Sequence, residues 1–232
     1  MKRLRLHDVA IPNRLSSVTL EVEAGRKLAL IGPNGGGKTS LLRAIAGVDE
    51  ATGRVSIDGI DLGEAGPRRA QLVGFMPASR DLAWPIPVRD MIALGNPRLA
   101  PGEVAEWIAR VELDTLADRP VNLLSTGERA RVLMARVLAG KPPLLLLDEP
   151  LSNLDPYWVL RFLEAIDQAA ADGAIVLAAL HDLSVADRFD RALLIDGGAV
   201  VADDSPAKLL SDQRFADAFR VERNGAGWKI RV

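Results

Sequence analysis

The sequence predicts an α/β layer fold in which helices cover a largely parallel sheet. Short, almost continuous apolar runs, typical of strands buried on both faces, occur at 26–32, 144–150 and 174–180. Segments with helical spacing of apolar residues alternate with these runs, as in chains of βαβ units. The 232 residues can bury one substantial core but hardly two, so we expect a single domain over 1–232.

The elements that follow the first apolar run continue this pattern. A helix is predicted over 38–47, where a glycine ends the apolar periodicity. The segment 53–59 is predicted as an edge strand with a turn at Asp58-Gly59, and it indicates a small β subdomain at the edge of the fold.

Between about Arg80 and Leu124 the strand signals vanish. Prolines are followed by helical patterns at 88–96 and 102–117. The second pattern places four apolar side chains on one helical face, namely Val104, Trp107, Ile108 and Val111. We therefore expect a helical subdomain over 80–124, inserted in the α/β core.

The second half of the chain returns to the α/β pattern. The segment 124–140 is predicted as a helix with Ser125 as its N-cap. The later elements are a strand at 144–150, a helix from Pro156 to about Gly173, strands at 174–180 and 191–198, and a small hairpin within 224–232. We expect the core to consist of 1–79 and 125–210, with 211–232 as a C-terminal tail.

Charge and composition exclude several classes of protein. The 29 basic and 31 acidic residues nearly cancel, and no long basic block is present, so we expect no nucleic-acid partner. The apolar stretches are far shorter than the roughly 20 residues of a membrane-spanning helix. Cysteine is absent and the start "MKRLRLHDVA" lacks the apolar core of a secretory signal, so the cytoplasm is the expected compartment.

The segment "GPNGGGKTS" satisfies the phosphate-binding pattern G-x-x-x-x-G-K-[ST], between a predicted strand and a predicted helix. Glycines let backbone N–H groups converge on a phosphate, Lys38 supplies a positive charge to the β- and γ-phosphates, and Thr39 offers its hydroxyl to Mg²⁺. A plain glycine-rich turn is the alternative. The predicted ATP-binding residues here are Gly32, Pro33, Asn34, Gly35, Gly36, Gly37, Lys38, Thr39 and Ser40.

Three polar residues follow two of the buried strands. Asp148 and Glu149 end the run at 144–150, at the sheet edge where open α/β sheets bind ligands. Asp148 is predicted as a Mg²⁺ ligand and Glu149 as the group that polarises the attacking water. His181 ends the next strand and is predicted to contact the γ-phosphate, so Lys38, Glu149 and His181 are the candidate catalytic residues. A polar turn and a solvated imidazole are the alternatives.

These motifs together resemble the nucleotide-binding subunits of ATP-binding cassette (ABC) transporters. The phosphate-binding loop is followed, in order, by "LSTGE", "LLLLDEP", "SNLD" and "HDL", over essentially the whole chain. The resemblance implies a P-loop NTPase core that binds and hydrolyses ATP with Mg²⁺. It also implies a head-to-tail homodimer in which one chain contacts the ATP of the other through Ser125, Thr126, Gly127, Glu128 and Asp155.

The chain departs from the family pattern at three places. Thr126 and Glu128 stand in a signature that is usually LSGGQ. Ala78 occupies the place of a glutamine that usually touches Mg²⁺ and the attacking water, and Gln71 is expected to lie inside the preceding strand, too far back to replace it. The segment "VAIPNRLSSVTL" offers no aromatic residue for adenine to stack on.

The segment "DLAWPIPVRDMIALG" resembles importer subunits for metal chelates, closest to those for vitamin B12 (cobalamin), iron-siderophores and haem. The resemblance implies a multi-span permease that meets the chain near Trp84 and Pro85, a substrate-binding protein, and a peripheral location on the cytoplasmic face of the inner (plasma) membrane. Two alternatives stay open. One is a soluble ABC ATPase that is not coupled to transport, and the other is an ATP-binding switch with weak hydrolysis.

Overall fold

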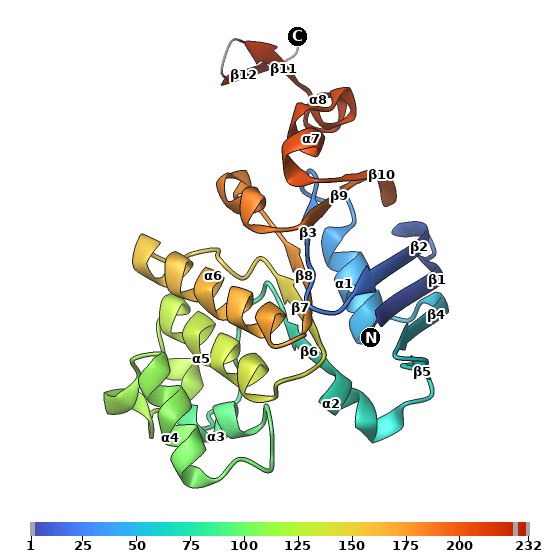
Figure 1. Ribbon diagram of the computed structural model, residues 1–232. Helices are drawn as coiled ribbons and strands as arrows, with labels where there is room; N and C mark the ends of the chain where they lie inside the picture. Colours follow the sequence, from blue (N-terminus) through green and yellow to red (C-terminus); the bar gives the residue numbers. More distant parts are fainter. Residues whose placement is uncertain (1–2, 225–226, 231–232) are drawn as a thin grey trace.

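The computed structural model describes residues 3–224 and 227–230, and it confirms the α/β prediction (Figure 1). The central sheet has five parallel strands and one antiparallel edge strand, β10. In spatial order its strands are β10 (Ala199–Asp204), β9 (Arg191–Asp196), β3 (Lys27–Ile31), β8 (Ile175–Ala179), β7 (Leu144–Asp148) and β6 (Val73–Met76).

A second, antiparallel sheet lies beside the first. Its order is β2 (Leu15–Glu23), β1 (Arg3–Ile11), β4 (Thr52–Ile57) and β5 (Ile60–Asp61). The strand predicted at 53–59 corresponds to β4, but its placement at the edge was wrong, because the two-residue β5 covers it. The predicted turn is confirmed, since Asp58 and Gly59 both have positive φ (51° and 79°), as a tight hairpin requires.

Helices cover both faces of the central sheet (Figure 1). Helix α1 (Lys38–Ala46) packs on one face, and α5 (Thr126–Ala139) and α6 (Pro156–Ala171) pack on the other. The other helices are α2 (Arg69–Leu72), α3 (Val88–Ala93), α4 (Pro101–Arg110), α7 (Pro206–Ser211) and α8 (Gln213–Phe219). Gln71 lies in α2 and not in a strand, so its predicted placement was wrong: a 3₁₀ turn at Gly66–Arg68 leads directly into this helix, and β6 starts only at Val73.

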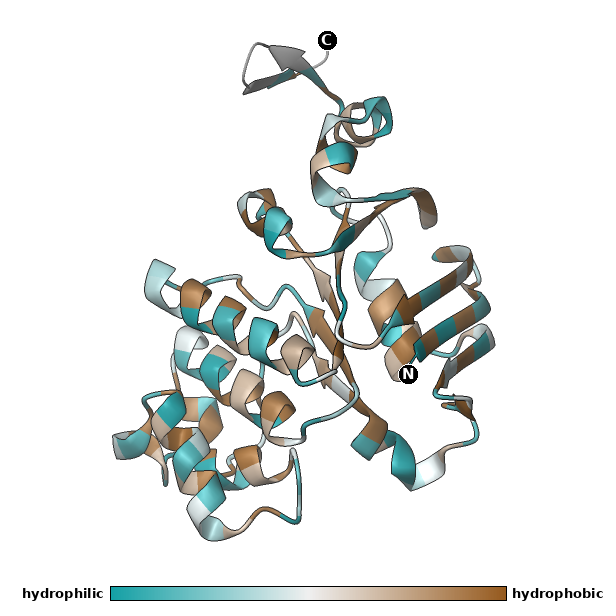
Figure 2. Ribbon diagram, viewed as in Figure 1, coloured by the Kyte–Doolittle hydropathy of each residue, from teal (hydrophilic) through white to brown (hydrophobic). Residues whose placement is uncertain are grey.

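The strands of the central sheet are buried on both faces. Along β3, Leu28 and Leu30 pack into a cluster with α1 and the second sheet, whereas Ala29 and Ile31 pack toward α3–α6. Figure 2 shows hydrophobic colouring along these central strands, while the surrounding helices carry both colours. This alternation explains why the strand segments read as continuous apolar runs in the sequence.

The segment between β6 and α5 is helical, as predicted. Val104, Ile108 and Val111 are buried, and Trp107 is half-buried. Helix α4 ends at Arg110, shortly before Glu112, whose φ of 53° is incompatible with a continuing helix. The boundaries expected for the core, the helical subdomain and the tail stay a prediction.

The C-terminal part ends in an antiparallel hairpin of β11 (Val221–Asn224) and β12 (Gly227–Ile230). A hairpin was predicted within 224–232, and its first strand lies further upstream. Residues 225–226 and 231–232 of the predicted segment lie outside the described residues. In the described part of the chain, no helix is both long enough and apolar enough to cross a membrane.

Candidate functional site: a phosphate-binding loop and two carboxylates

The loop between β3 and α1 is held closely against the end of β9. A Cβ added to Gly32 would lie 1.9 Å from the carbonyl oxygen of Ile195, and one added to Gly36 would lie 2.7 Å from the same atom. Gly32 also has a φ of +155°, which other residues rarely adopt. Only glycine fits at these two positions, so the loop forms the open backbone cradle that a phosphate group requires.

Lys38, the first residue of α1, folds back over this loop. Its Nζ donates hydrogen bonds to the carbonyl oxygens of Gly32 (2.7 Å) and Pro33 (2.9 Å). Burial lowers the pKa of Lys38, and the nearby charges of Glu149 and Asp148 oppose this shift. The loop therefore holds a largely buried cation at the place where phosphate charge would arrive.

Thr39 and Asp148 bring two oxygen donors together beside the loop. The Thr39 hydroxyl donates to Oδ1 of Asp148 at 3.0 Å. Burial raises the pKa of Asp148, while hydrogen bonds from the Thr39 hydroxyl and the Ala78 backbone N–H oppose the rise. Among the described residues no cluster of three or more histidine, cysteine or acidic side chains forms a metal site. This pair fits Mg²⁺ that is also held by phosphate oxygens, the usual arrangement for this ion.

Glu149 and His181 lie at the carboxyl ends of the neighbouring strands β7 and β8, as predicted. Glu149 is half-buried and has a φ of 49°, whereas His181 is exposed. The carboxylate of Asp182, next to His181, accepts a hydrogen bond from the backbone N–H of Ser184 at 2.9 Å. Asp182 therefore caps the following 3₁₀ turn, Leu183–Arg188.

A hollow of about 760 Å³ joins the loop to His181. Gly32, Lys38 and His181 line it, together with the C-terminal end of α8 at Phe219 and Arg220. Sequence reasoning missed this contribution of α8, because nothing in the pattern of the tail places it beside the loop. Of the described residues that line the hollow, none comes from 124–140.

The segment "LSTGE" begins α5 with reciprocal hydrogen bonds, which confirms Ser125 as the N-cap. The Ser125 hydroxyl accepts from the Glu128 backbone N–H (3.3 Å), and the Glu128 carboxylate accepts from the Ser125 N–H (2.7 Å), which lowers the pKa of Glu128. Ser125 and Thr126 are exposed. A Cβ on Gly127 would lie 3.9 Å from the carbonyl oxygen of Asn153, so this segment lies beside "SNLD".

Asp155, the last residue of "SNLD", caps another helix. Its carboxylate accepts a hydrogen bond from the backbone N–H of Trp158 at 3.1 Å, at the start of α6. The starts of α5 and α6 contribute no residue to the lining of the hollow at Lys38.

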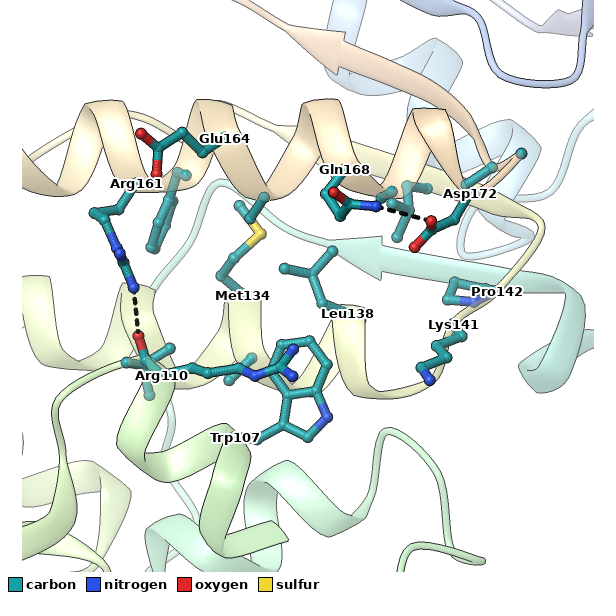
Figure 3. Close-up of a pocket in the computed structure, with 18 of the residues that line it drawn as sticks. Trp107, Arg110, Met134, Leu138, Lys141, Pro142, Arg161, Glu164, Gln168 and Asp172 are labelled. Atoms are coloured by element: carbon teal, nitrogen blue, oxygen red, sulfur yellow. Dashed lines mark hydrogen bonds between the residues drawn. The ribbon is translucent and has the colours of Figure 1, made fainter. Parts of the chain in front are cut away.

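A second cavity, of about 690 Å³, lies between α4, α5 and α6 (Figure 3). Its wall includes the Trp107 ring, over which the Arg110 guanidinium lies at 4.8 Å from the ring centroid. None of the predicted ATP-site residues lines it. Of the three candidate catalytic residues, Lys38 and His181 line the first hollow, whereas Glu149 does not.

Sequence reasoning also missed Arg80, which contacts the backbone of Glu149, and Arg129, which contacts Arg80. Arg80 is 6% exposed, and its guanidinium donates to the carbonyl oxygens of Pro77 and Glu149. Its own carbonyl oxygen accepts a hydrogen bond from Arg129 of α5, which also donates to the carbonyl of Leu124. A charged residue in a polar loop gives no sequence signal of such burial.

Comparison with known proteins agrees with this geometry. The sequence model of the family described as ABC transporter matches residues 15–152, more than half of the chain. The chain belongs to the ABC transporter ATPases. As a member of this family it binds ATP and is an ATPase.

Two curated relatives carry the description "Hemin import ATP-binding protein HmuV". The one from Streptomyces coelicolor is 38% identical over 216 residues, which cover 88% of this chain and 77% of the relative. The one from Pseudomonas fluorescens is 37% identical over 237 residues, which cover 94% of this chain and 93% of the relative. The similarity to the Pseudomonas fluorescens relative thus extends over nearly the full length of both chains.

Solved structures show the same fold. An ATP-binding subunit of an ABC transporter superposes with a TM-score of 0.81 at 24% identity, covering 91% of this chain and 93% of that one. A dimeric ATP-binding cassette in a post-hydrolysis state, bound to ADP and Pi, superposes with a TM-score of 0.77 at 25% identity, covering 88% of this chain and 98% of that one.

Proposed function

We propose that this ABC ATPase is the ATP-hydrolysing subunit of an importer that takes up a metal chelate, with haem as the favoured cargo. The observation that carries the proposal is the near-full-length similarity to the hemin import ATP-binding protein of Pseudomonas fluorescens, which is 37% identical over 94% of this chain and 93% of the relative. Iron-siderophores and cobalamin are the other cargoes considered. Cargo chemistry itself resides in the permease and the substrate-binding protein.

In this proposal the hydrolytic half-site consists of the hollow at the phosphate-binding loop together with Thr39, Asp148 and Glu149. The N–H groups of the loop and the Lys38 ammonium bind the β- and γ-phosphates. Thr39 and Asp148 hold Mg²⁺, which neutralises phosphate charge. Glu149 orients the attacking water and accepts its proton, and His181 contacts the γ-phosphate. The hydrogen bond from Thr39 to Asp148 supports the shared role of these two side chains.

The other half of each site comes from a second copy of the chain. Ser125 and Thr126 at the start of α5 are exposed, and the N–H groups of Thr126 and Gly127 point out of the helix end without a helix carbonyl to accept them, which suits a phosphate. Gly127, Glu128 and Asp155 lie in the same surface in this proposal. Because the hollow at Lys38 is lined without this turn, a head-to-tail homodimer completes both sites.

The permease is proposed to contact the loop that precedes α3. Trp84 is 77% exposed, and neighbouring Pro85 is exposed as well. An exposed tryptophan is a typical anchor of a protein interface, because its large apolar ring gains much from burial. Because the subunit uses ATP, we propose that it lies at the cytoplasmic face of the membrane and is attached there through the permease.

The test is affinity purification of the tagged full chain from its own cells in mild detergent, with mass spectrometry of what co-purifies. We expect a multi-span permease and a substrate-binding protein. Trp84→Ala is expected to reduce permease recovery by about tenfold or more, the scale of losing an aromatic interface anchor. Leu160→Ala is the control, because Leu160 is also exposed (57%) but lies on α6.

The remaining outcomes decide between the alternatives. Recovery of ribosomes or nucleic acid without any permease would favour a soluble ABC ATPase. Recovery of a permease whose cargo uptake persists when ATP turnover by the complex is negligible would favour the switch with weak hydrolysis. Equal permease recovery with Trp84→Ala and Leu160→Ala would remove the loop before α3 from the interface.

A further inference from the structure

Arg80 is a buried cation that contacts the backbone of Glu149, one of the two carboxylate residues. Its side chain is 6% exposed, and its guanidinium donates to the carbonyl oxygens of Pro77 and, at 2.8 Å, of Glu149. Among the described residues, its Nε has no hydrogen-bond partner. Burial lowers the pKa of Arg80, and the charges of Asp148 and Glu149 oppose this shift. A guanidinium is costly to bury, so its position calls for a reason beyond packing.

Glu149 needs support of this kind, because its backbone is in the left-handed region (φ 49°). Non-glycine residues stay there only where their surroundings fix them. The Glu149 carbonyl oxygen accepts from Arg80, from the Ser152 hydroxyl (2.9 Å) and from the Ser152 backbone N–H (3.2 Å), and the Glu149 N–H donates to the Ala179 carbonyl oxygen at 3.2 Å. Of these contacts, only the one from Arg80 is charged, and charge-assisted hydrogen bonds are the strong ones.

The same arginine is connected to the first turn of α5. Nη1 of Arg129 donates to the Arg80 carbonyl oxygen at 3.2 Å, and Nε of Arg129 donates to the Leu124 carbonyl oxygen at 3.0 Å. Leu124 directly precedes Ser125. The methyl side chain of Ala78 can donate no hydrogen bond, so in this loop the side-chain link to Glu149 comes from Arg80.

We propose that Arg80 is a positioning residue for hydrolysis: it fixes the backbone of Glu149, and with it the carboxylate, and through Arg129 it ties that position to the start of α5. The inference rests on the proposed role of Glu149. Movement of α5 against the loop at Pro77–Asp81 then changes the position of the carboxylate, so closure of the second chain on α5 and readiness for hydrolysis are linked.

The test compares Arg80→Met with Arg69→Met in the purified full chain. Arg69 is a matched control, because its guanidinium also bridges two backbone carbonyls, those of Leu62 (3.0 Å) and Ile45 (2.9 Å), and also has an unpaired Nε. Arg80→Met is expected to lower kcat for ATP about tenfold or more, with KM within about twofold, because an interaction that orients the base acts on the chemical step. Arg69→Met is expected to keep kcat within about twofold.

A second measurement needs no turnover. Hydrogen–deuterium exchange of the segment 149–155, without nucleotide, is expected to rise several-fold in Arg80→Met and to stay unchanged in Arg69→Met. If Arg80→Met cannot be purified folded, Arg80→Lys replaces it. Lysine keeps the positive charge but lacks the planar guanidinium that donates to both carbonyl oxygens. The decrease in kcat and the rise in exchange are therefore expected to be smaller in Arg80→Lys than in Arg80→Met.

The variant Glu149→Gln tests the proposed role of Glu149 separately from the positioning role of Arg80. It is expected to lower kcat about a hundredfold or more, as for loss of a general base. Unchanged turnover in Glu149→Gln would overturn the proposed role of Glu149 itself. A large loss in Glu149→Gln together with wild-type kcat and wild-type exchange in Arg80→Met would overturn only the positioning role, as would equal effects of Arg80→Met and Arg69→Met.

Discussion

Two oppositely charged groups of the phosphate site are buried. Burial lowers the pKa of Lys38 and raises the pKa of Asp148, so each is shifted toward its neutral form. The chain keeps both charges in a place where they reduce its stability. Such a cost is expected where charge is kept for a ligand, here a phosphate and its cation.

Asp148→Asn is expected to stabilise the nucleotide-free protein at neutral pH. Because folding raises the pKa of Asp148 above 3.8, its contribution to the free energy of unfolding falls as pH rises from 3.8 through the raised value. Asparagine carries no charge and so avoids this destabilisation. The free energy of unfolding of the variant is therefore expected to exceed that of wild type by on the order of 1 kcal/mol at neutral pH, and by less at acidic pH. Urea unfolding across this pH range, without Mg²⁺, measures the difference.

The control for this prediction is Asp118→Asn, because the Asp118 side chain is 75% exposed and pairs with Arg89 at the surface. Its unfolding free energy is expected to stay within about 0.5 kcal/mol of wild type. An Asp148→Asn variant that is less stable than wild type at neutral pH, or equally shifted at every pH, would show that its carboxylate is well compensated in the folded chain.

Helix α5 combines two roles in its first turn, since Ser125 both caps the helix and, in the proposed dimer, contacts the ATP of the second chain. Ser125→Ala is expected to lower the free energy of unfolding by about 1 kcal/mol, and Ser125→Gly by only a few tenths, because glycine is tolerated as an N-cap. The long capping distance, 3.3 Å, favours a small loss. Chemical denaturation measures both values.

The two Ser125 variants separate stability from binding. Both lack the hydroxyl, so both are expected to weaken ATP-dependent dimerisation by about tenfold. Light scattering with ATP, in a Glu149→Gln background, measures the dimer. If Ser125→Gly dimerises like wild type while Ser125→Ala does not, the hydroxyl acts only as a helix cap.

The elements differ in how far their sequence predicts them. Helix α5 and strand β7 were predicted because a cap, a periodicity or a buried run is local information. Strand β4 was placed at an edge because its neighbour β5, two residues long, carries almost no pattern. Gln71 was misplaced because α2 is a single turn, too short for a periodicity to show.

The residues of the candidate site also differ in how far the sequence predicts them. The loop at 32–40, Asp148 and Glu149 follow from motifs whose spacing carries the chemistry. The Arg80 contact could not be predicted, because it joins carbonyl and guanidinium groups 69 residues apart in the chain. Whether a polar loop residue is buried depends on which loops the sheet brings together, and a local sequence pattern does not predict that arrangement.

At the scale of the whole molecule, the start of α5 does not line the hollow at Lys38, and we propose that the two halves of each ATP site come from two chains. A head-to-tail dimer therefore predicts complementation between two inactive variants. Lys38→Ala damages the phosphate loop, and Ser125→Arg blocks the first turn of α5. In a mixed dimer, one composite site contains both substitutions and the other contains neither.

Mixing Lys38→Ala with Ser125→Arg is therefore expected to restore ATPase activity. With random pairing, about half of the dimers are mixed and about a quarter of all sites are intact, so turnover rises toward about a quarter of wild type. Lys38→Ala mixed with Glu149→Gln is the control: both substitutions affect the same chain's half of the site, so every composite site stays damaged. ATPase rates at equal total protein measure both mixtures. Failure of the first pair to exceed the second would mean that each chain hydrolyses ATP with its own residues, and the arrangement of two sites between two copies would have to be abandoned.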